Sequence, residues 1–420
     1  MRRVSRRLIP FVFVLYIFNF LDRSNVGLAA LQMNRDLGFS PAAFGFGAGI
    51  FFIGYALFEV PSNLVLVRVG ARRWIARIMI TWGVLASALM FVRTPAQFYV
   101  LRFCLGVAEA GFFPAIMYYL SQWYPASMRA RSSAWFMTAI PLSGLLGGPL
   151  GGWLIGLNGA GGLAGWQWLF LVEGVPSVVL GFAVLRYLTE TPDNATWLPA
   201  PQRDWLVERL RRDRETSPAP HGMPPLRALG HPLIWLVALP ELLVTTAGYA
   251  YLFWGPTMLR ESLHLGNQMI GWLTAVISVV CALAMVAVGW SSDRTGDRVV
   301  HAAVCALAVA AGCAGAALLD GPVARMASLA FAEIAVIAFL APFWTLPTIL
   351  LSGSSAAVGI ALVNAIGNVA GFLGPNVVSY LRMHTGGDSG AFLALSGMAV
   401  AAALVCYSMR WSPAIRTRRS

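Results

Sequence analysis

Charged residues are scarce in this chain. Only 11% of its 420 residues are Asp, Glu, Lys or Arg, whereas 58% are hydrophobic and the mean hydropathy is +0.69. Soluble globular domains contain about 25% charged residues. The composition therefore excludes a soluble enzyme held by one membrane anchor, and it predicts a polytopic membrane protein.

Lysine is absent, and all 30 basic residues are arginines. Of these, 23 fall in one alternating set of loops and tails, five in the other set, and two, Arg23 and Arg102, deep within apolar runs. Such an imbalance marks the cytoplasmic loops of membrane proteins, so the net charge of +12 does not indicate a nucleic-acid partner. It predicts a protein of the inner (plasma) membrane with both termini in the cytoplasm, which requires an even number of spans.

Recognisable catalytic and metal-binding patterns are also absent. The five cysteines lie in predicted spans, without metal-ligand spacing or a disulfide pattern, and we expect them to be small buried hydrophobes. The sequence offers no nucleophile–base set and no phosphate-binding loop. We therefore expect neither an enzyme nor a metal or cofactor site.

Twelve apolar runs of about 20 residues are present, each long enough to cross a bilayer. The fold class is thus predicted to be all-α with twelve transmembrane helices. The runs are 8–31, 44–67, 74–93, 97–122, 132–156, 166–188, 232–256, 269–291, 299–319, 325–350, 355–380 and 390–410.

One connection is long and polar, and it divides the chain into a six-helix bundle at 1–188, a cytoplasmic linker at 189–231 and a second six-helix bundle at 232–420. Within the linker, residues 202–214 are typical of a short amphipathic helix. Its apolar face is predicted to contain Trp205, Leu206, Val207 and Leu210.

The two bundles are predicted to be repeats of one another. The sequence R-V-G-A-R at 68–72 recurs as R-T-G-D-R at 294–298, and Gly148-Pro149 recurs as Gly374-Pro375. Both pairs are separated by 226 positions, since 294 − 68 and 374 − 148 are equal. Parallel repeats of this kind form pseudo-symmetric transporters whose substrate site lies between the halves, near the membrane midplane.

Two pairs of charged residues fall inside apolar runs: Asp22 with Arg23, and Arg102 with Glu109. Each costs roughly 2.5–3.5 kcal/mol at the centre of a membrane helix, so such residues are usually functional. Arg102 and Glu109 are seven residues apart, about two helical turns, and should face the same way. We interpret the four as the working centre. Neutralisation of Asp22 by Arg23 among lipid headgroups, and a structural Arg102–Glu109 ion pair, remain alternatives.

Several motifs carry a family resemblance. The sequence G-W-S-S-D-R-T-G-D-R at 289–298 resembles the cytoplasmic G-x-x-x-D-R-x-G-x-R motif of the major facilitator superfamily, although Val67 occupies the acidic position of the first copy. Within that superfamily the chain resembles the tartrate and aromatic-acid branch of the anion:cation symporter family. The carriers of this likeness are F-L-D-R-S-N at 20–25, F-E-V-P-S-N at 58–63, V-G-A-R-R-W at 69–74, residues 102–114, W-Q-W-L-F at 166–170 and F-W-T-L-P at 343–347.

The resemblance implies roles for individual residues. Substrate contacts would be Arg23, Tyr55, Trp344 and Asn364, and proton coupling would involve Asp22, Glu109 and Arg102. The residues implied for the cytoplasmic latch are Arg68, Arg72, Asp293, Arg294, Gly296 and Arg298. Ile140, Ala341 and Phe343 stand where sugar-acid carriers place polar side chains, which favours a tartrate-like hydroxy acid or an aromatic carboxylate.

The charged residues also predict a mechanism by themselves. The arginine fork fits a carboxylate in two hydrogen bonds. If a substrate carboxylate takes the arginine, the displaced Asp or Glu is left unpaired and binds a proton. We expect a monomeric carrier that alternates access by rocking and moves a small organic carboxylate with protons through the lipid bilayer. Anion exchange without net proton movement, and a membrane enzyme or sensor, remain alternatives.

Overall fold

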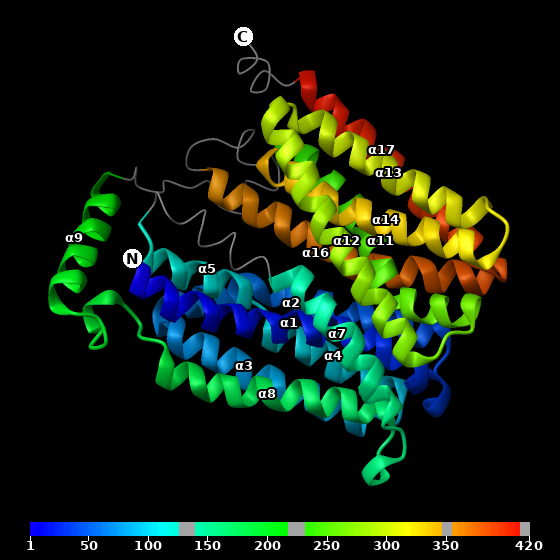
Figure 1. Ribbon diagram of the computed structural model, residues 1–420, viewed down its shortest axis with the longest axis horizontal. Coiled ribbons are helices and arrows are strands. Elements are labelled where there is room, and N and C mark those ends of the chain that lie inside the picture. The colour runs from blue at the N-terminus through cyan, green and yellow to red at the C-terminus, as the bar shows by residue number, and fades with distance from the viewer. Residues whose placement is uncertain (126–138, 217–231, 347–354, 412–420) are drawn as a thin grey trace.

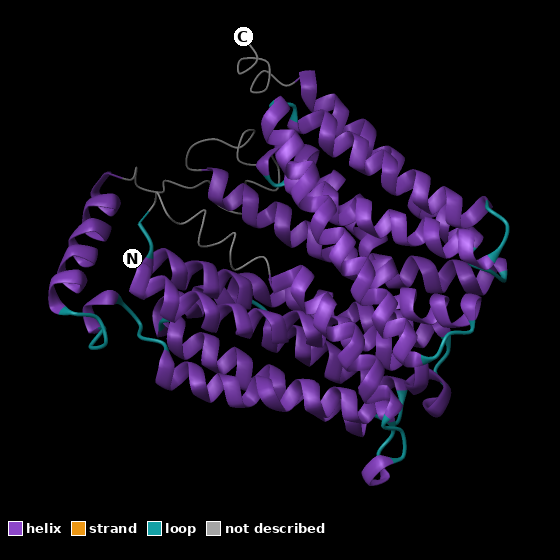
Figure 2. Ribbon diagram, viewed as in Figure 1, coloured by secondary structure: helices purple, strands orange, loops and turns teal. Residues whose placement is uncertain are grey.

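The computed structural model describes residues 1–125, 139–216, 232–346 and 355–411, and the regular structure within these ranges is entirely helical (Figures 1 and 2). Ten stretches of this described part are long and apolar enough to cross a membrane. The remaining two predicted spans, the fifth and the eleventh, are occupied by α7 and α16. The predicted all-α, twelve-helix fold class is confirmed.

The first six spans are seven helices, because the fourth span is broken. They are α1 (Arg2–Leu37), α2 (Pro41–Val69), α3 (Ala71–Ala88), α4 (Pro95–Glu109), α5 (Phe112–Trp123), α7 (Ala139–Gly156) and α8 (Gly165–Tyr187). Helix starts follow the local sequence: Pro41 follows the cap Ser40, and Pro95 follows Thr94, whose side chain forms a capping box with Gln97.

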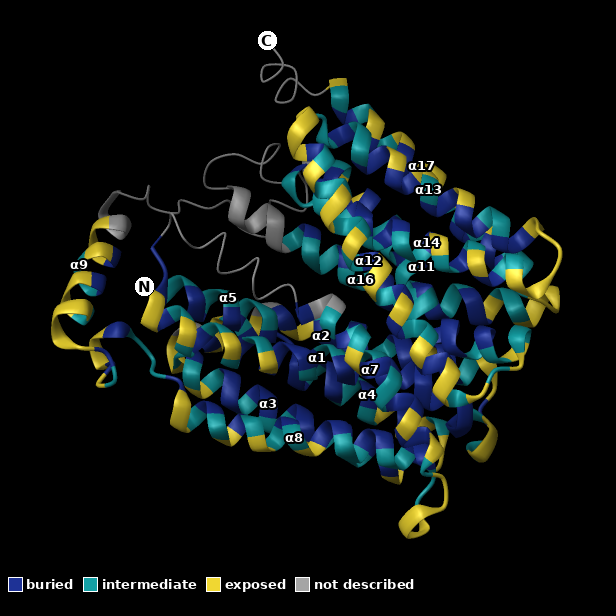
Figure 3. Cartoon of the chain, in the orientation of Figure 1, coloured by how far each residue is buried: buried dark blue, intermediate teal, exposed yellow. Residues whose placement is uncertain are grey.

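The second six spans are α11 (Pro232–Leu263), α12 (Asn267–Thr295), α13 (Arg298–Leu318), α14 (Pro322–Phe343), α16 (Ser355–Thr385) and α17 (Ser389–Ser408). Buried residues gather inside the two bundles, as Figure 3 shows. Many large apolar side chains are instead exposed, among them Leu283, Val286 and Leu404, each about two-thirds exposed. Exposed apolar area on this scale is expected of a surface that faces lipid.

The break in the fourth span corrects the expectation of a continuous helix at 97–122. The helix ends at Glu109, and Gly111 has a φ of 86°, a left-handed conformation that glycine adopts without strain. The Ser62 hydroxyl donates to the Ala110 carbonyl at 2.6 Å, so this carbonyl at the break has a partner. Glu109 is therefore the last residue of α4.

The two halves contact each other through small residues. A Cβ on Gly148 of α7 would collide with the backbone of Gly271 of α12, and one on Gly49 of α2 would meet the Asn376 amide of α16 at 2.7 Å. Asn376 also donates to the Gly45 carbonyl at 3.3 Å, and Arg260 donates to the Leu31 carbonyl at 2.8 Å. Toward the opposite end, near α9 and the N-terminus, the halves diverge (Figure 1).

The linker helix is present as α9 (Ala200–Thr216). Leu206 and Leu210 are buried as predicted, but Trp205 is 53% exposed, so the predicted apolar face is wrong at that residue. Two arginines one turn away, Arg211 and Arg212, donate to Glu208 and lower the pKa of its carboxyl to about 2. Three parts of the predicted chain lie outside the described residues: the linker at 217–231, the start of the fifth and the end of the tenth predicted span, and residues 412–420.

The start of the linker packs on the N-terminal half. Arg7 lies between the rings of Tyr187 and Trp197, with its guanidinium carbon 4.5 and 4.8 Å from their centroids. Trp197 in turn stacks on Trp123 at 5.6 Å. Cation–π contacts of this kind hold the linker against the end of α1 and α8.

Candidate functional site

A buried ion pair connects α1 and α4. The Arg23 Nε and Nη2 atoms lie 2.6 and 2.5 Å from Glu109 Oε1, and Asn19 Nδ2 donates to the same oxygen at 2.8 Å. Glu109 is fully buried, whereas the Arg23 side chain keeps 12% of its surface exposed. Glu109 Oε2 has no partner among the described residues. One carboxylate oxygen thus accepts three charge-assisted or polar bonds, and the other is left available.

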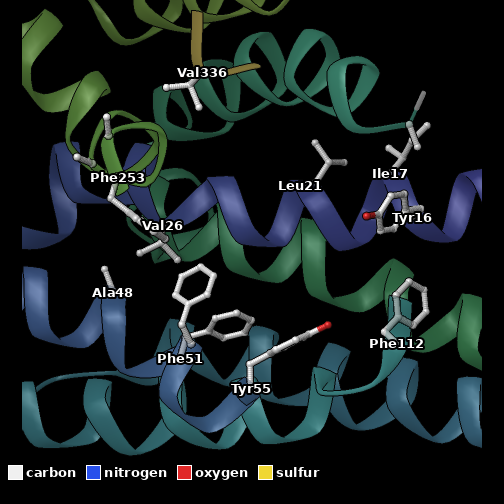
Figure 4. Close-up of a cluster of buried hydrophobic side chains, with 14 of the residues drawn as sticks. Tyr16, Ile17, Leu21, Val26, Ala48, Phe51, Tyr55, Phe112, Phe253 and Val336 are labelled. Carbon is white, nitrogen blue, oxygen red and sulfur yellow. The ribbon is translucent and has the colours of Figure 1, made fainter. Parts of the chain in front are cut away.

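Aromatic side chains surround the guanidinium. Phe51 and Tyr55 extend from α2 toward α1 (Figure 4), and the Arg23 guanidinium carbon lies 5.6 and 4.9 Å from their ring centroids. Tyr249 of α11 contributes from the other half, with its hydroxyl as a hydrogen-bond partner of Arg23. The predicted neighbours Arg23 and Tyr55 are therefore brought together, and both halves contact the arginine.

Arg102 does not support the alternative of a structural pair with Glu109. It forms no ion pair with Glu109 within the described part of the chain; instead its guanidinium donates to the Ala48 carbonyl of α2 at 3.1 Å and reaches the Gly47 carbonyl at 3.4 Å. Gly106, one turn further on, has no side chain to separate α4 from the Phe51 backbone. The close approach of the two helices explains why Arg102 finds these carbonyls first. Helical spacing gave its direction along α4 but not its partner.

Asp22 faces away from Arg23, although the two are consecutive. Its carboxylate accepts from the Trp82 indole at 2.8 Å and from the Asn25 amide at 3.3 Å, and only 2% of the residue is exposed. Successive residues on a helix point about 100° apart, so the neighbours Asp22 and Arg23 face two different parts of the bundle. Asp22 is thus buried with partners and does not neutralise Arg23 among headgroups.

The implied contacts from the C-terminal half are spread along two helices. The Asn364 amide of α16 lies within hydrogen-bonding reach of the Glu59 carboxylate of α2, so this contact also crosses between the halves. Trp344 is half-buried at the end of α14, with its ring 5.7 Å from that of Phe343. Phe343 itself is fully buried and stacks on Phe339. The side chain of Ile140 lies outside the described residues.

The two copies of the cytoplasmic motif are built differently. In the second copy, Gly296 ends α12 with a φ of 70°, Asp293 pairs with Arg298 at 3.2 Å, and Arg294 lies over the Trp290 ring at 5.4 Å.

In the first copy, which lacks the acidic residue, Glu190 from the end of the sixth span accepts from the backbone of Ala71 and Arg72 at 2.5 and 3.1 Å. Arg72 donates to the Leu185 carbonyl, and Arg68 is exposed. A carboxylate at a helix start compensates the positive end of the helix dipole. Sequence reasoning missed Glu190, Asn19 and Tyr249.

Comparison with known proteins agrees with this architecture. Residues 12–375 match the family model of the Major Facilitator Superfamily. A protein of Agrobacterium vitis named "Putative tartrate transporter" is 44% identical over 96% of this chain and 93% of its own length. The metabolite transport protein NicT of Pseudomonas putida is 40% identical over 98% of this chain and 94% of its own.

Solved structures agree on the fold. A bacterial homologue of the human lysosomal transporter Spinster, in an inward-facing and occupied conformation, superposes with a TM-score of 0.77 at 18% identity, covering 97% of this chain and 98% of that one. The helical architecture, the sequence match across most of the chain and the named relatives all agree. The chain belongs to the Major Facilitator Superfamily and is a multi-pass membrane transporter of a small molecule, not an enzyme.

Proposed function

We propose that this transporter carries a small organic anion together with protons, and that Arg23 is the residue that exchanges one carboxylate for another. The observation that supports this is the Arg23–Glu109 pair, in which a partly exposed guanidinium holds a fully buried carboxylate. A carboxylate entering from solvent reaches the same donors. Both anions cannot occupy the guanidinium fork in the same geometry, so they compete.

Competition for Arg23 gives a route to proton coupling. When the substrate takes the guanidinium, Glu109 keeps only the Asn19 amide and is left as a charged group in a site that water scarcely reaches. Burial of an unpaired carboxylate is unfavourable, and binding a proton removes the charge. Substrate binding and protonation of Glu109 therefore favour each other, as linkage requires.

Proton coupling also addresses the electrical cost of import. Moving one negative charge inward against an inside-negative potential of 100 mV costs about 2.3 kcal/mol. One proton cancels the charge of a monoanion, and a second makes its import favourable. Exchange of one anion for another needs no proton, so a dependence of uptake on the pH gradient distinguishes symport from exchange.

The substrate class is proposed from the lining. Rings of Phe20, Phe51 and Tyr55 make the site apolar around a single guanidinium, which suits a compact hydroxy acid or an aromatic carboxylate. Glu59 and Asn364 offer hydrogen bonds that suit a hydroxyl group. The name of the Agrobacterium vitis relative fits a tartrate-like acid.

The orientation of the protein in the membrane is proposed from the distribution of arginine between the two sets of loops. Arg35, Arg260 and Arg382 belong to the arginine-poor set of loops, and all three lie at the end where the halves contact each other. If that end faces away from the cytoplasm, the structure is inward-facing and Arg23 receives solvent from the cytoplasmic side.

The experiment uses purified protein in proteoliposomes. Small mono- and dicarboxylic acids, tartrate included, are first screened for stabilisation against heat, since a ligand that binds the folded state raises Tm. A stabilising acid is then offered with an imposed pH gradient, acid outside. We expect accumulation that follows the gradient; uptake indifferent to the gradient for every bound acid would contradict proton coupling.

Glu109→Gln separates symport from exchange. The amide keeps the shape but neither ionises nor takes up a proton, so we expect counterflow of labelled acid to continue while gradient-driven accumulation is lost. Wild-type protein that performs only counterflow would establish exchange instead.

A further inference from the structure

A second pair of buried carboxyl groups lies behind the Arg23 site, where α1 packs against α3 and α8. Asp22 and Glu173 are each 2% exposed, and Asn25, 1% exposed, stands between them. The Asn25 amide donates to Asp22 at 3.3 Å and lies within hydrogen-bonding reach of Glu173. Trp82 of α3 donates to the other Asp22 oxygen at 2.8 Å.

Close helix packing keeps this cluster dry. The next residue on α8, Gly174, lies so near α3 that an added Cβ would meet the Ser87 nitrogen at 2.7 Å and the Gly83 carbonyl at 2.9 Å. Hydrophobic burial around Trp82 is complete as well, since none of its surface is exposed. Water therefore has no room to hydrate the two carboxyl groups between these helices.

Neither acid has an ion-pair partner within 4 Å among the described residues. Facing Glu173, α1 presents Asp22 and the Asn25 amide, α3 presents Trp82, and the described part of α7 has no titratable residue in its sequence. The charges that act on Asp22 from α4 are Glu109 and Arg102, which are opposite in sign. Glu109 is already paired with Arg23, so Arg102 is a single cation for the two carboxyl groups, and ionising both would leave one negative charge uncompensated.

Two orphan atoms indicate how the cluster is balanced instead. Asn25 Oδ1 and Glu173 Oε2 are both buried without a hydrogen-bond partner in the described structure. Both are acceptors when Glu173 is ionised, so neither can satisfy the other. A proton on Glu173 turns its carboxyl into a donor for the amide oxygen, while the amide nitrogen continues to donate to Asp22. One added proton thus satisfies both orphan atoms and removes the one charge that Arg102 does not balance.

We infer that Glu173 is a proton-binding residue, and that it shares one proton with Asp22 through Asn25. In the step, a proton leaves solvent and binds a carboxylate oxygen of this pair, with no other bond made or broken. Asp22 and Asn25 lie on the same turns of α1 as Arg23. If the proposed function holds, movement of α1 on substrate binding therefore changes the pair and releases or takes up its proton. The transporter then has two proton sites in one half, at Glu109 and at Glu173.

The resident proton is tested by infrared spectroscopy on the full-length protein in lipid. A protonated carboxyl group has a C=O stretching band separate from that of a carboxylate, and the band shifts in D₂O. We expect a band that disappears in Glu173→Gln but remains in Glu241→Gln, a matched change at a buried glutamate of α11. Persistence of the full band intensity in Glu173→Gln would overturn the inference.

Asn25→Leu supplies the second variant. It removes both the amide donor and the amide acceptor, so the Glu173 band is expected to move to the frequency of a carboxyl group without a hydrogen bond. The melting temperature and the elution volume of this variant report whether it folds. An unmoved band in folded protein would contradict sharing through Asn25.

Whether the proton of Glu173 moves with the substrate is tested by a separate measurement. The number of protons moved per acid molecule is found from the membrane potential that just balances a given pH gradient. We expect one proton fewer in Glu173→Gln than in wild type, with an unchanged count in Glu241→Gln. An unchanged count in Glu173→Gln would mean that the proton is resident but not transported. Wild-type uptake that ignores pH would reject the proposed function and leave the infrared result standing.

Discussion

Each half has a buried carboxyl group at an equivalent helix crossing, but the neighbouring side chains of the two carboxyl groups differ. Where α4 meets α1, Glu109 has the cation Arg23. Where α14 meets α11, Glu333 lies near Tyr251, and 226 positions beyond Arg23 the chain has Tyr249. Glu333 Oε2 and the Tyr251 hydroxyl lack partners among the described residues and line a cavity of about 10 Å³, close to the space of one water molecule.

The difference indicates a division of labour. A carboxylate that alternates between a cation and a proton needs the cation within reach, and only the α1–α4 crossing provides it. A carboxyl group next to a phenol in an apolar bundle is more stable as a neutral acid and needs no exchange. In the proposed mechanism the charge exchange therefore belongs to the N-terminal half, and the C-terminal half contributes Tyr249, Asn364 and the surface against which the N-terminal half moves.

The largest expected effect comes from Arg23→Ala. It removes the anchor for the substrate and leaves Glu109 buried without its cation, a change that typically costs 3–5 kcal/mol. We expect loss of the ligand-induced rise in Tm and a lower Tm without ligand. Adding Glu109→Gln should restore much of the Tm but not the ligand response. If the double variant melts as low as the single one, the ion pair is not the cause.

The next largest effect is expected from substituting two glycines that the repeat relates, Gly148 and Gly374. In Gly148→Ala the new methyl group collides with Gly271 of the other half, whereas in Gly374→Ala it meets the Thr246 carbonyl at 2.6 Å inside the same half. We expect Gly148→Ala to separate the halves and increase, several-fold, the labelling rate of a cysteine introduced at Ser278.

Gly374→Ala should instead lower Tm and leave labelling unchanged. Overpacking a helix contact costs roughly 1–3 kcal/mol, so the fall in Tm is measurable. Equal effects of the two substitutions on labelling would show that the equivalent glycines serve one role and not two.

A smaller effect is expected from Tyr249→Phe. It removes the hydroxyl that Arg23 contacts across the halves, and a hydrogen bond of this kind contributes about 1 kcal/mol net, or roughly fivefold in Kd. The Kd follows from the dependence of Tm on acid concentration. Tyr251→Phe, two residues along the same helix, is the control and should change the Kd less than about twofold.

The smallest effect should be that of Glu333→Gln. Because Glu333 has no cationic partner among the described residues, replacing this neutral acid with an amide should leave gradient-driven uptake within about twofold of wild type. The same change at Glu109 is expected to abolish that uptake. A comparable loss in both variants would end the proposed division between the halves.

Hydropathy and charge predicted most of the fold. Runs of about 20 apolar residues predicted all twelve spans, because length and polarity alone decide whether a helix crosses lipid. The break at Gly111 was not predicted, since a glycine within an apolar run is equally compatible with an unbroken membrane helix. Trp205 was placed wrongly because helical periodicity does not distinguish a buried face from the face beside it.

The candidate site was predicted in its residues but not in its pairings. Burial cost singled out Asp22, Arg23, Arg102 and Glu109, and the structure places all four inside the N-terminal half. Spacing along one helix does not say which neighbouring helix approaches, so an Arg102–Glu109 ion pair remained an alternative and the Arg23–Glu109 pair was not identified. Two signals were available but unused: Asn19 lies one turn before Arg23, and Tyr249 lies one repeat beyond it.

The interrupted fourth span has a mechanical consequence. Because α4 ends at Glu109 and α5 starts afresh after Gly111, the two pieces are joined by a short swivel in place of a stiff rod. A tilt of α5 can then occur without dragging Arg102 away from α2. Glu109, the acid that we propose exchanges its partner, lies at this junction, so loss or gain of its charge would act where the span bends most easily.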